Sequence, residues 1–204
     1  MAPSFFDAKT KQPVVHPLEP LVQENIKKFR NTLRPLGKMY VPRARMHVLG
    51  YTDRSVVVKT GDDDVVMKIS PFDEDFLHEI EMLRHMNKHT KTSTSPLCPR
   101  YHCSFSVNKK FAVILMKNIT QVFKKYTDIG TYTNRHYKLL QRTLKRLHEH
   151  GVCHNDLKPE HIYVFTYPND RYKMCFLDYG SSFLIDDEHP STDKSRLHSL
   201  QMHS

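Results

Sequence analysis

The chain has 204 residues, which is enough for one sound hydrophobic core or for two small lobes. Its formal charge is +9 with the histidines neutral and its isoelectric point is near 9.3, which favours anionic partners such as nucleotides, nucleic acids or acidic proteins. No apolar run is long enough to span a membrane and the four cysteines form no C-x-x-C pair, so we expect no membrane association and a reduced, cytoplasmic or nuclear protein.

Residues 1–40 are expected to form an N-terminal arm followed by one amphipathic helix. The first 16 residues contain prolines and show no periodicity, which is typical of a flexible arm. From Pro17 to Leu36 the apolar residues recur at helical spacing, and the basic residues gather towards the end of the segment. This helix could pack on the lobe that follows it or bind a partner protein, and the sequence leaves both open.

The segment 47–69 is expected to form three short strands. Gly50 and Val57 stand at the first and last positions of a G-x-G-x-x-G-x-V pattern, although its later glycines are replaced. Glycines let the backbone approach phosphate groups closely, so this turn is a candidate phosphate-binding loop that holds its ligand less tightly. The third strand, Val65-Val66-Met67-Lys68, ends on a lysine.

A helix and a hairpin are expected after Lys68. The helix has an apolar face and carries two acidic residues, Glu79 and Glu81. Tyr101–Val107 and Phe111–Met116 are expected to form the two strands of a hairpin around Asn108-Lys109-Lys110.

A second helix, over 134–150, leads into the motif on which the rest of the chain depends. Gly151 is a typical C-cap for this helix. The stretch from 154 to 162 reads H-N-D-L-K-P-E-H-I, and 176–180 reads F-L-D-Y-G. Alone, Asp156 could cap a turn and Asp178 could lie in a hairpin turn. Together, two carboxylates and the intervening Lys158 have the residue types that phosphoryl transfer needs.

These motifs, with V-V-M-K and the glycine turn before them, resemble those of the protein kinases over residues 45–185. The resemblance implies an α+β fold of two lobes, protein-kinase-like, with a truncated C-terminal lobe. Residues 41–118 would form the N-lobe and residues 119–204 the truncated C-lobe. ATP would be the bound nucleotide, accompanied by Mg²⁺ or Mn²⁺.

The resemblance also implies a role for each site residue. Asp156 would act as the catalytic base that orients the acceptor hydroxyl, and Lys158 would stabilise the γ-phosphate. Asp178 would hold the metal ion, and His161 stands where the family has a second metal-binding residue, an Asn. Leu83, His154 and Tyr179 would stack and so couple the helix, the loop and the metal-binding turn. Glu79 would pair with Lys68, with Glu81 as the alternative. The residues that would contact ATP are Gly50, Val57, Val66, Lys68, Glu79 and Met116.

The implied activity is transfer of the γ-phosphate of ATP to a Ser or Thr hydroxyl of a protein. The alternative is a non-catalytic pseudokinase that binds and regulates a partner protein, because His161 and Asn155 both depart from the family pattern. A third hypothesis is a factor that binds nucleic acid through the basic surface.

The part of the chain after Gly180 is short and contains no A-P-E motif, which ends the activation segment in the family. In a full-length kinase, later helices would cover the apolar face of the helix at 134–150. We therefore expect that this chain leaves the face uncovered, and that a second copy of the chain or another protein covers it in a homodimer or a complex.

Overall fold

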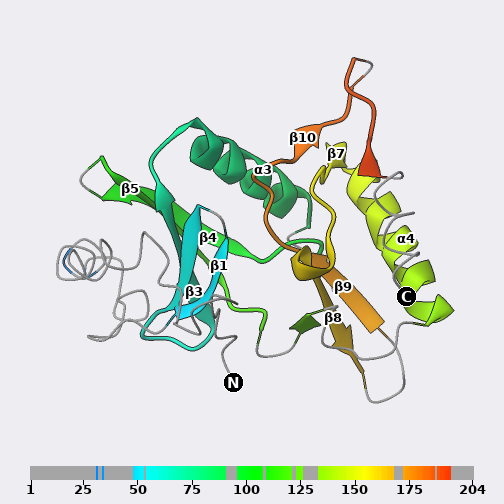
Figure 1. The fold of residues 1–204 in the computed structure, drawn as a ribbon, viewed down its shortest axis with the longest axis horizontal. Helices are drawn as coiled ribbons and strands as arrows, with labels where there is room; N and C mark the ends of the chain where they lie inside the picture. The colour runs from blue at the N-terminus through cyan, green and yellow to red at the C-terminus, as the bar shows by residue number, and fades with distance from the viewer. Residues whose placement is uncertain are drawn as a thin grey trace, which may run out of the picture. The chain divides into compact units, whose positions relative to one another are not determined.

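The computed structural model describes residues 31, 34, 48–52, 54–90, 96–107, 109–120, 123–125, 133–167, 172–186 and 188–193 (Figure 1). The predicted arm and amphipathic helix within residues 1–40 therefore lie outside the described residues, apart from positions 31 and 34. The chain divides into two compact units, the first containing Met1–Phe76 and His102–Asn118 and the second containing Leu77–Tyr101 and Ile119–Ser204. Both helices and sheets are present, which confirms the predicted α+β class.

The first unit is built on one five-stranded sheet in the order β1-β2-β3-β5-β4. Pairing is antiparallel between β1 and β2, between β2 and β3, and between β3 and β5. The strands occupy the segments that were expected to form three strands and a hairpin: β1 Val48–Thr52, β2 Ser55–Lys59, β3 Val65–Pro71, β4 Tyr101–Val107 and β5 Phe111–Lys117.

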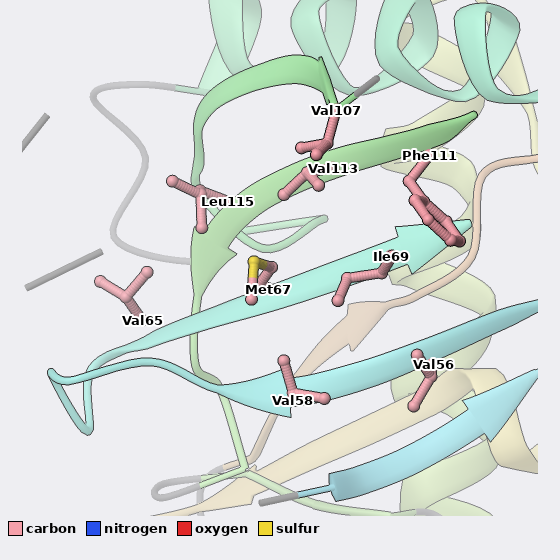
Figure 2. Packing of buried hydrophobic residues seen from close by; sticks show 9 residues of the cluster. All are labelled: Val56, Val58, Val65, Met67, Ile69, Val107, Phe111, Val113 and Leu115. Carbon is pink, nitrogen blue, oxygen red and sulfur yellow. The ribbon is translucent and has the colours of Figure 1, made fainter. Parts of the chain in front are cut away.

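One face of this sheet carries the hydrophobic core of the first unit. Figure 2 shows nine of its buried side chains, which come mainly from β2, β3 and β5: Val56, Val58, Val65, Met67, Ile69, Val107, Phe111, Val113 and Leu115. Because successive side chains of a strand point to opposite faces, Val57, Val66, Lys68 and Met116 lie on the other face. The predicted ATP-contacting strand residues therefore share one face of the sheet.

Helix α3, Glu74–Thr90, begins at a capping aspartate. The Oδ1 atom of Asp73 accepts a hydrogen bond from the Phe76 N–H at 3.1 Å, which satisfies one of the free donors of the first turn. Arg54, in the turn between β1 and β2, forms ion pairs with both Asp73 and Asp75. The start of the helix is thus tied to the candidate phosphate-binding turn within the first unit.

The second unit contains the remaining strands and the second helix. Its elements are β6 Lys124–Lys125, α4 Asn134–Glu149, β7 Val152–Cys153, the 3₁₀ helix η4 Pro159–His161, β8 Ile162–Thr166, β9 Tyr172–Phe176 and β10 Phe183–Leu184. Strands β6, β8 and β9 form one sheet, and β7 pairs with β10 in another. Gly151 follows α4 with a φ of +72°, a left-handed conformation that favours glycine, as the sequence predicted.

The expectation that α4 exposes its apolar face is wrong. Leu140, Leu144 and Leu147 are at most 2% exposed. The reason is that α4 packs against β9 and β7, which come from the same chain. The face of α4 that remains exposed is polar and basic, with Lys138, Arg142 and Lys145. An uncovered stripe on α4 therefore gives no support to a homodimer.

The four cysteines are all free thiols. Cys98, Cys153 and Cys175 are buried and Cys103 is half-buried. Among the described residues, no helix has the length and apolar character needed to cross a membrane.

Candidate active site

The residues predicted in the two motifs of the second unit converge on one place. The Lys158 Nζ lies 3.0 Å from the Asp156 Oδ2, and the His161 Nδ1 lies 3.3 Å from the same oxygen. On its other side, the His161 Nε2 lies 3.5 Å from the Asp178 Oδ2. The structure thus brings together both carboxylates, the lysine and the histidine, with His161 between the two acids.

The register of β8 and β9 explains why the two motifs meet. Ile162 at the start of β8 is paired with Phe176 at the end of β9, so the residues just outside this pair lie opposite one another. The Leu177 N–H donates a hydrogen bond to the His161 carbonyl at 2.8 Å and extends the pairing by one step. Asp178 follows directly and is therefore presented beside the His161 ring.

The loop that carries Asp156 is supported by a buried carboxylate that the sequence did not reveal. Asp193 is fully buried and accepts hydrogen bonds from the N–H groups of His154 and Asn155, each at 2.8 Å. The His148 Nε2 of α4 lies 3.0 Å from the same carboxylate. Burial alone raises the pKa of Asp193, but the hydrogen bonds from His148, His154 and Asn155 outweigh this effect and lower that pKa overall.

Two residues of the site hold a left-handed backbone conformation. Asn155 has a φ of +58° and Asp178 a φ of +61°, and Lys109 is the only other non-glycine residue with positive φ in the described part of the chain. Such a conformation costs roughly 1–3 kcal/mol in a non-glycine residue, and it persists only when contacts enforce it. The Asn155 Nδ2 donates to the Ser181 carbonyl at 3.1 Å, and its Oδ1 accepts from the Thr192 hydroxyl at 2.9 Å.

An aromatic cluster packs beneath the loop. The His154 ring lies 5.6 Å from the Phe176 ring and 5.1 Å from the Tyr179 ring, measured between centroids. The predicted contact between His154 and Tyr179 is therefore present. The Tyr179 hydroxyl donates to the Leu97 carbonyl at 3.1 Å, which satisfies this buried polar group.

His154 is held in its neutral form. Its Nε2 lies 2.9 Å from the Leu177 carbonyl, which can only accept, so this nitrogen carries the proton. Its Nδ1 then accepts from the Asp156 N–H at 3.4 Å. Burial lowers the pKa of His154, and the hydrogen bond to Leu177 and the nearby Asp193 oppose this only in part.

We expect the free energy of unfolding to fall on acidification below about pH 6.5, the ordinary pKa of histidine. In that range the unfolded chain binds a proton at His154 that the folded chain does not, so stability is lost as the pH falls towards the lowered folded pKa. The loss per pH unit approaches about 1.4 kcal/mol for one such group. Urea unfolding at pH 7.5 and 5.5 measures it.

The His154→Phe variant is the control for this prediction, because a phenyl ring keeps the contacts with Phe176 and Tyr179. The variant should be less stable at pH 7.5 but should lose less stability on acidification. An equal loss in both proteins would assign the effect to another group, such as His136, whose pKa burial and Arg135 also lower.

The predicted nucleotide-contacting residues of the first unit are aligned across its sheet. Gly50 is paired with Val57, and Val57 with Lys68, while Val66 lies opposite Met116. A Cβ atom added at Gly50 would meet no protein atom within 4 Å, so the chain itself leaves open space there. Lys68 is buried, at 7% exposure. Glu79 is also buried, at 6% exposure, in the part of α3 that belongs to the second unit.

The donor set of the second unit fits a divalent cation bound with a phosphate. In the described residues, no three His, Cys, Asp or Glu side chains form a metal-binding group. Asp178 and His161 do offer an oxygen and a nitrogen that face each other. One or two protein ligands completed by phosphate oxygens and waters are usual for magnesium in nucleotide sites.

Comparison with known proteins points to the same class of protein. The model of the lipopolysaccharide kinase (Kdo/WaaP) family matches residues 109–201, which contain both motifs. The "Probable serine/threonine-protein kinase FPV226" of Fowlpox virus (strain NVSL) is 32% identical over 77 residues, 37% of this chain and 25% of that protein. "Calcium-dependent protein kinase 20" of Oryza sativa subsp. japonica is 30% identical over 113 residues, 53% of this chain and 20% of that protein.

A longer match is found with "Calcium-dependent protein kinase 8" of Oryza sativa subsp. japonica, which is 29% identical over 144 residues, 65% of this chain and 26% of that protein. The chain thus covers about a quarter or less of the length of these relatives. The motifs, the convergence of Asp156, Lys158 and Asp178, and these similarities agree with one another. The chain is therefore a member of the protein-kinase-like superfamily.

Proposed function

We propose that the protein is a phosphotransferase that moves the γ-phosphate of ATP to a Ser or Thr hydroxyl of a protein. The observation that carries this proposal is the convergence of Asp156, Lys158 and Asp178 in one site of the second unit. The free cysteines support a reducing compartment, the cytoplasm or the nucleus, as the place of this activity.

In the proposed reaction, Asp156 accepts a hydrogen bond from the acceptor hydroxyl and orients its oxygen towards the γ-phosphorus. A bond forms between these two atoms as the bond to the bridging oxygen breaks, ADP leaves, and the hydroxyl proton passes to the Asp156 carboxylate. Lys158, whose Nζ lies 3.0 Å from that carboxylate, brings a positive charge to the transferring group. A divalent cation, when bound by Asp178, would neutralise charge on the phosphates.

We further propose that Lys68 of the first unit and its neighbours in the sheet bind the nucleotide. Replacing Lys68 by Met should raise the dissociation constant of ATP by roughly 10- to 100-fold, since a charge-assisted hydrogen bond contributes about 1.5–3 kcal/mol. The fold should be retained, because Met fills a similar volume at this buried position. Calorimetric titration with ATP, with and without Mg²⁺ or Mn²⁺, measures the change.

Lys59→Met is the matched control, because Lys59 lies on the neighbouring strand β2 and pairs with Asp63 at 3.4 Å. This variant should bind ATP like the wild type. If a folded Lys68→Met protein kept the wild-type affinity, the assignment of the nucleotide site would be wrong.

The alternative, a pseudokinase that regulates a partner protein, is favoured by the replacement of the family's Asn by His161. ATP binding without transfer of label from γ-³²P-ATP to casein or myelin basic protein would support it. A protein substrate or partner remains our proposal, and the burial of the apolar face of α4 removes the argument for a homodimer. The hypothesis that the protein binds nucleic acid is supported by the exposed basic face of α4. Measuring the salt dependence of RNA or DNA binding tests this hypothesis.

A further inference from the structure

The orientation of the His161 ring is fixed by a backbone carbonyl. Its Nδ1 lies 3.0 Å from the Asp156 carbonyl oxygen. A carbonyl oxygen can only accept, so Nδ1 must carry the proton. In the neutral ring the lone pair then belongs to Nε2, the nitrogen that faces Asp178. A backbone carbonyl that fixes the tautomer in this way is the usual support of a metal-binding histidine.

The Nε2 and the Asp178 Oδ2 lie 3.5 Å apart. In the neutral form both atoms carry lone pairs, so they repel each other unless a cation lies between them. Metal bonds to nitrogen and carboxylate oxygen are about 2.0–2.2 Å long, so two ligands of one cation stand roughly 3–3.5 Å apart. The observed separation is within reach of a single shared cation.

The backbone holds His161 in this position. Its N–H donates to the Lys158 carbonyl at 2.9 Å, and its carbonyl accepts from the Leu177 N–H at 2.8 Å. Pro159 opens the 3₁₀ helix that ends at His161. The side chain is only 9% exposed, so little ordering of the ring is needed when a cation binds.

We propose that His161 coordinates, through Nε2 and together with Asp178, the divalent cation of the proposed phosphotransferase, and that it makes the site selective for transition-row cations over Mg²⁺. The inference rests on the proposed function for the nucleotide that completes the site. Its physical basis is that Mg²⁺ prefers oxygen ligands, whereas the affinity of imidazole rises from Mn²⁺ through Co²⁺ to Ni²⁺.

The first test measures cation affinity in the presence of the β,γ-methylene analogue of ATP, which cannot be hydrolysed at that bond. The ratio of wild-type to His161→Asn affinity should rise in the order Mg²⁺, Mn²⁺, Co²⁺, Ni²⁺. For Ni²⁺ it should exceed the roughly 10- to 100-fold loss that removal of an outer-shell partner causes. His189→Asn, at an exposed histidine, should leave all four affinities unchanged. Should His161→Asn fail to fold, His161→Gln replaces it.

The second test detects the nitrogen directly and needs no turnover. Pulsed electron paramagnetic resonance of Mn²⁺ bound to protein labelled with ¹⁵N-histidine should show a ¹⁵N coupling that disappears in His161→Asn and persists in His189→Asn. A missing coupling, or an affinity ratio equal for all four cations, would overturn the inference. The proposed function is tested separately by transfer of label from γ-³²P-ATP. If label is transferred but the ¹⁵N coupling is missing, the phosphotransferase function stands and the metal-binding role of His161 is wrong. If the coupling is present but no label is transferred, the metal-binding role of His161 stands and the phosphotransferase function is wrong.

Discussion

Replacing Asp156 by Asn should lower the rate of phosphoryl transfer by about 10²- to 10⁴-fold, the usual contribution of a positioned acid–base group. The amide keeps the size of the side chain and can still accept from Lys158, which lies 3.0 Å away in the native protein. It cannot accept the hydroxyl proton. The fold and the affinity for ATP should therefore change little, and the loss should appear in the turnover rate with γ-³²P-ATP.

Glu160→Gln is the matched control for this prediction. Glu160 lies in the 3₁₀ helix η4 that follows the Asp156 loop, and it is exposed. The substitution again replaces an acid by its amide. Its variant should retain the wild-type rate. A folded Asp156→Asn protein that also transferred phosphate at the wild-type rate would remove Asp156 from the reaction and would favour a role in binding alone.

Replacing Asp193 by Asn should lower the free energy of unfolding by roughly 3–5 kcal/mol, the usual cost of removing one partner from a buried charged network. The carboxylate accepts from two backbone N–H groups and lies 3.0 Å from His148. The amide that replaces the Asp193 carboxylate would have only one acceptor oxygen, so its NH₂ group would face the backbone N–H of either His154 or Asn155, which is also a donor. Chemical unfolding measures the loss.

Asp186→Asn is the matched control, because Asp186 lies in the same part of the chain but is exposed. It accepts from the N–H groups of Glu188 and His189, so the local geometry is similar while the surroundings are aqueous. Its variant should unfold almost like the wild type. Equal stability of the Asp193→Asn protein would show that His154 and Asn155 find other acceptors.

The sequence was sufficient where function depends on short-range geometry. The segment 47–69 was predicted to form three short strands, and β1, β2 and most of β3 lie in it. Asp156, Lys158 and His161 lie within six residues, and the β8–β9 hairpin must return the chain to Asp178. The resemblance of both motifs to those of the protein kinases therefore predicted that these four side chains belong to one site, and the structure brings them together.

The sequence failed where a contact joins distant segments. Asp193 lies in a polar stretch without any motif, and its role appears only when β10 pairs with β7 and returns the chain to α4 and the loop. The same long-range packing covers Leu140 and Leu144, which an incomplete helical lobe was expected to expose. Spacing along the chain carries no information about which distant element covers a given face.

The separation of Asp193 from its partners also sets an order of events during synthesis. Its carboxylate binds the N–H groups of residues that precede it by 38 and 39 positions. A nascent chain that has not yet reached residue 193 has the Asp156 loop without this acceptor, and Asn155 must then hold its left-handed conformation with less support. Asp193 is the last residue of the described part of the chain, so translation adds the acceptor that supports the Asp156 loop after every other described residue of the site.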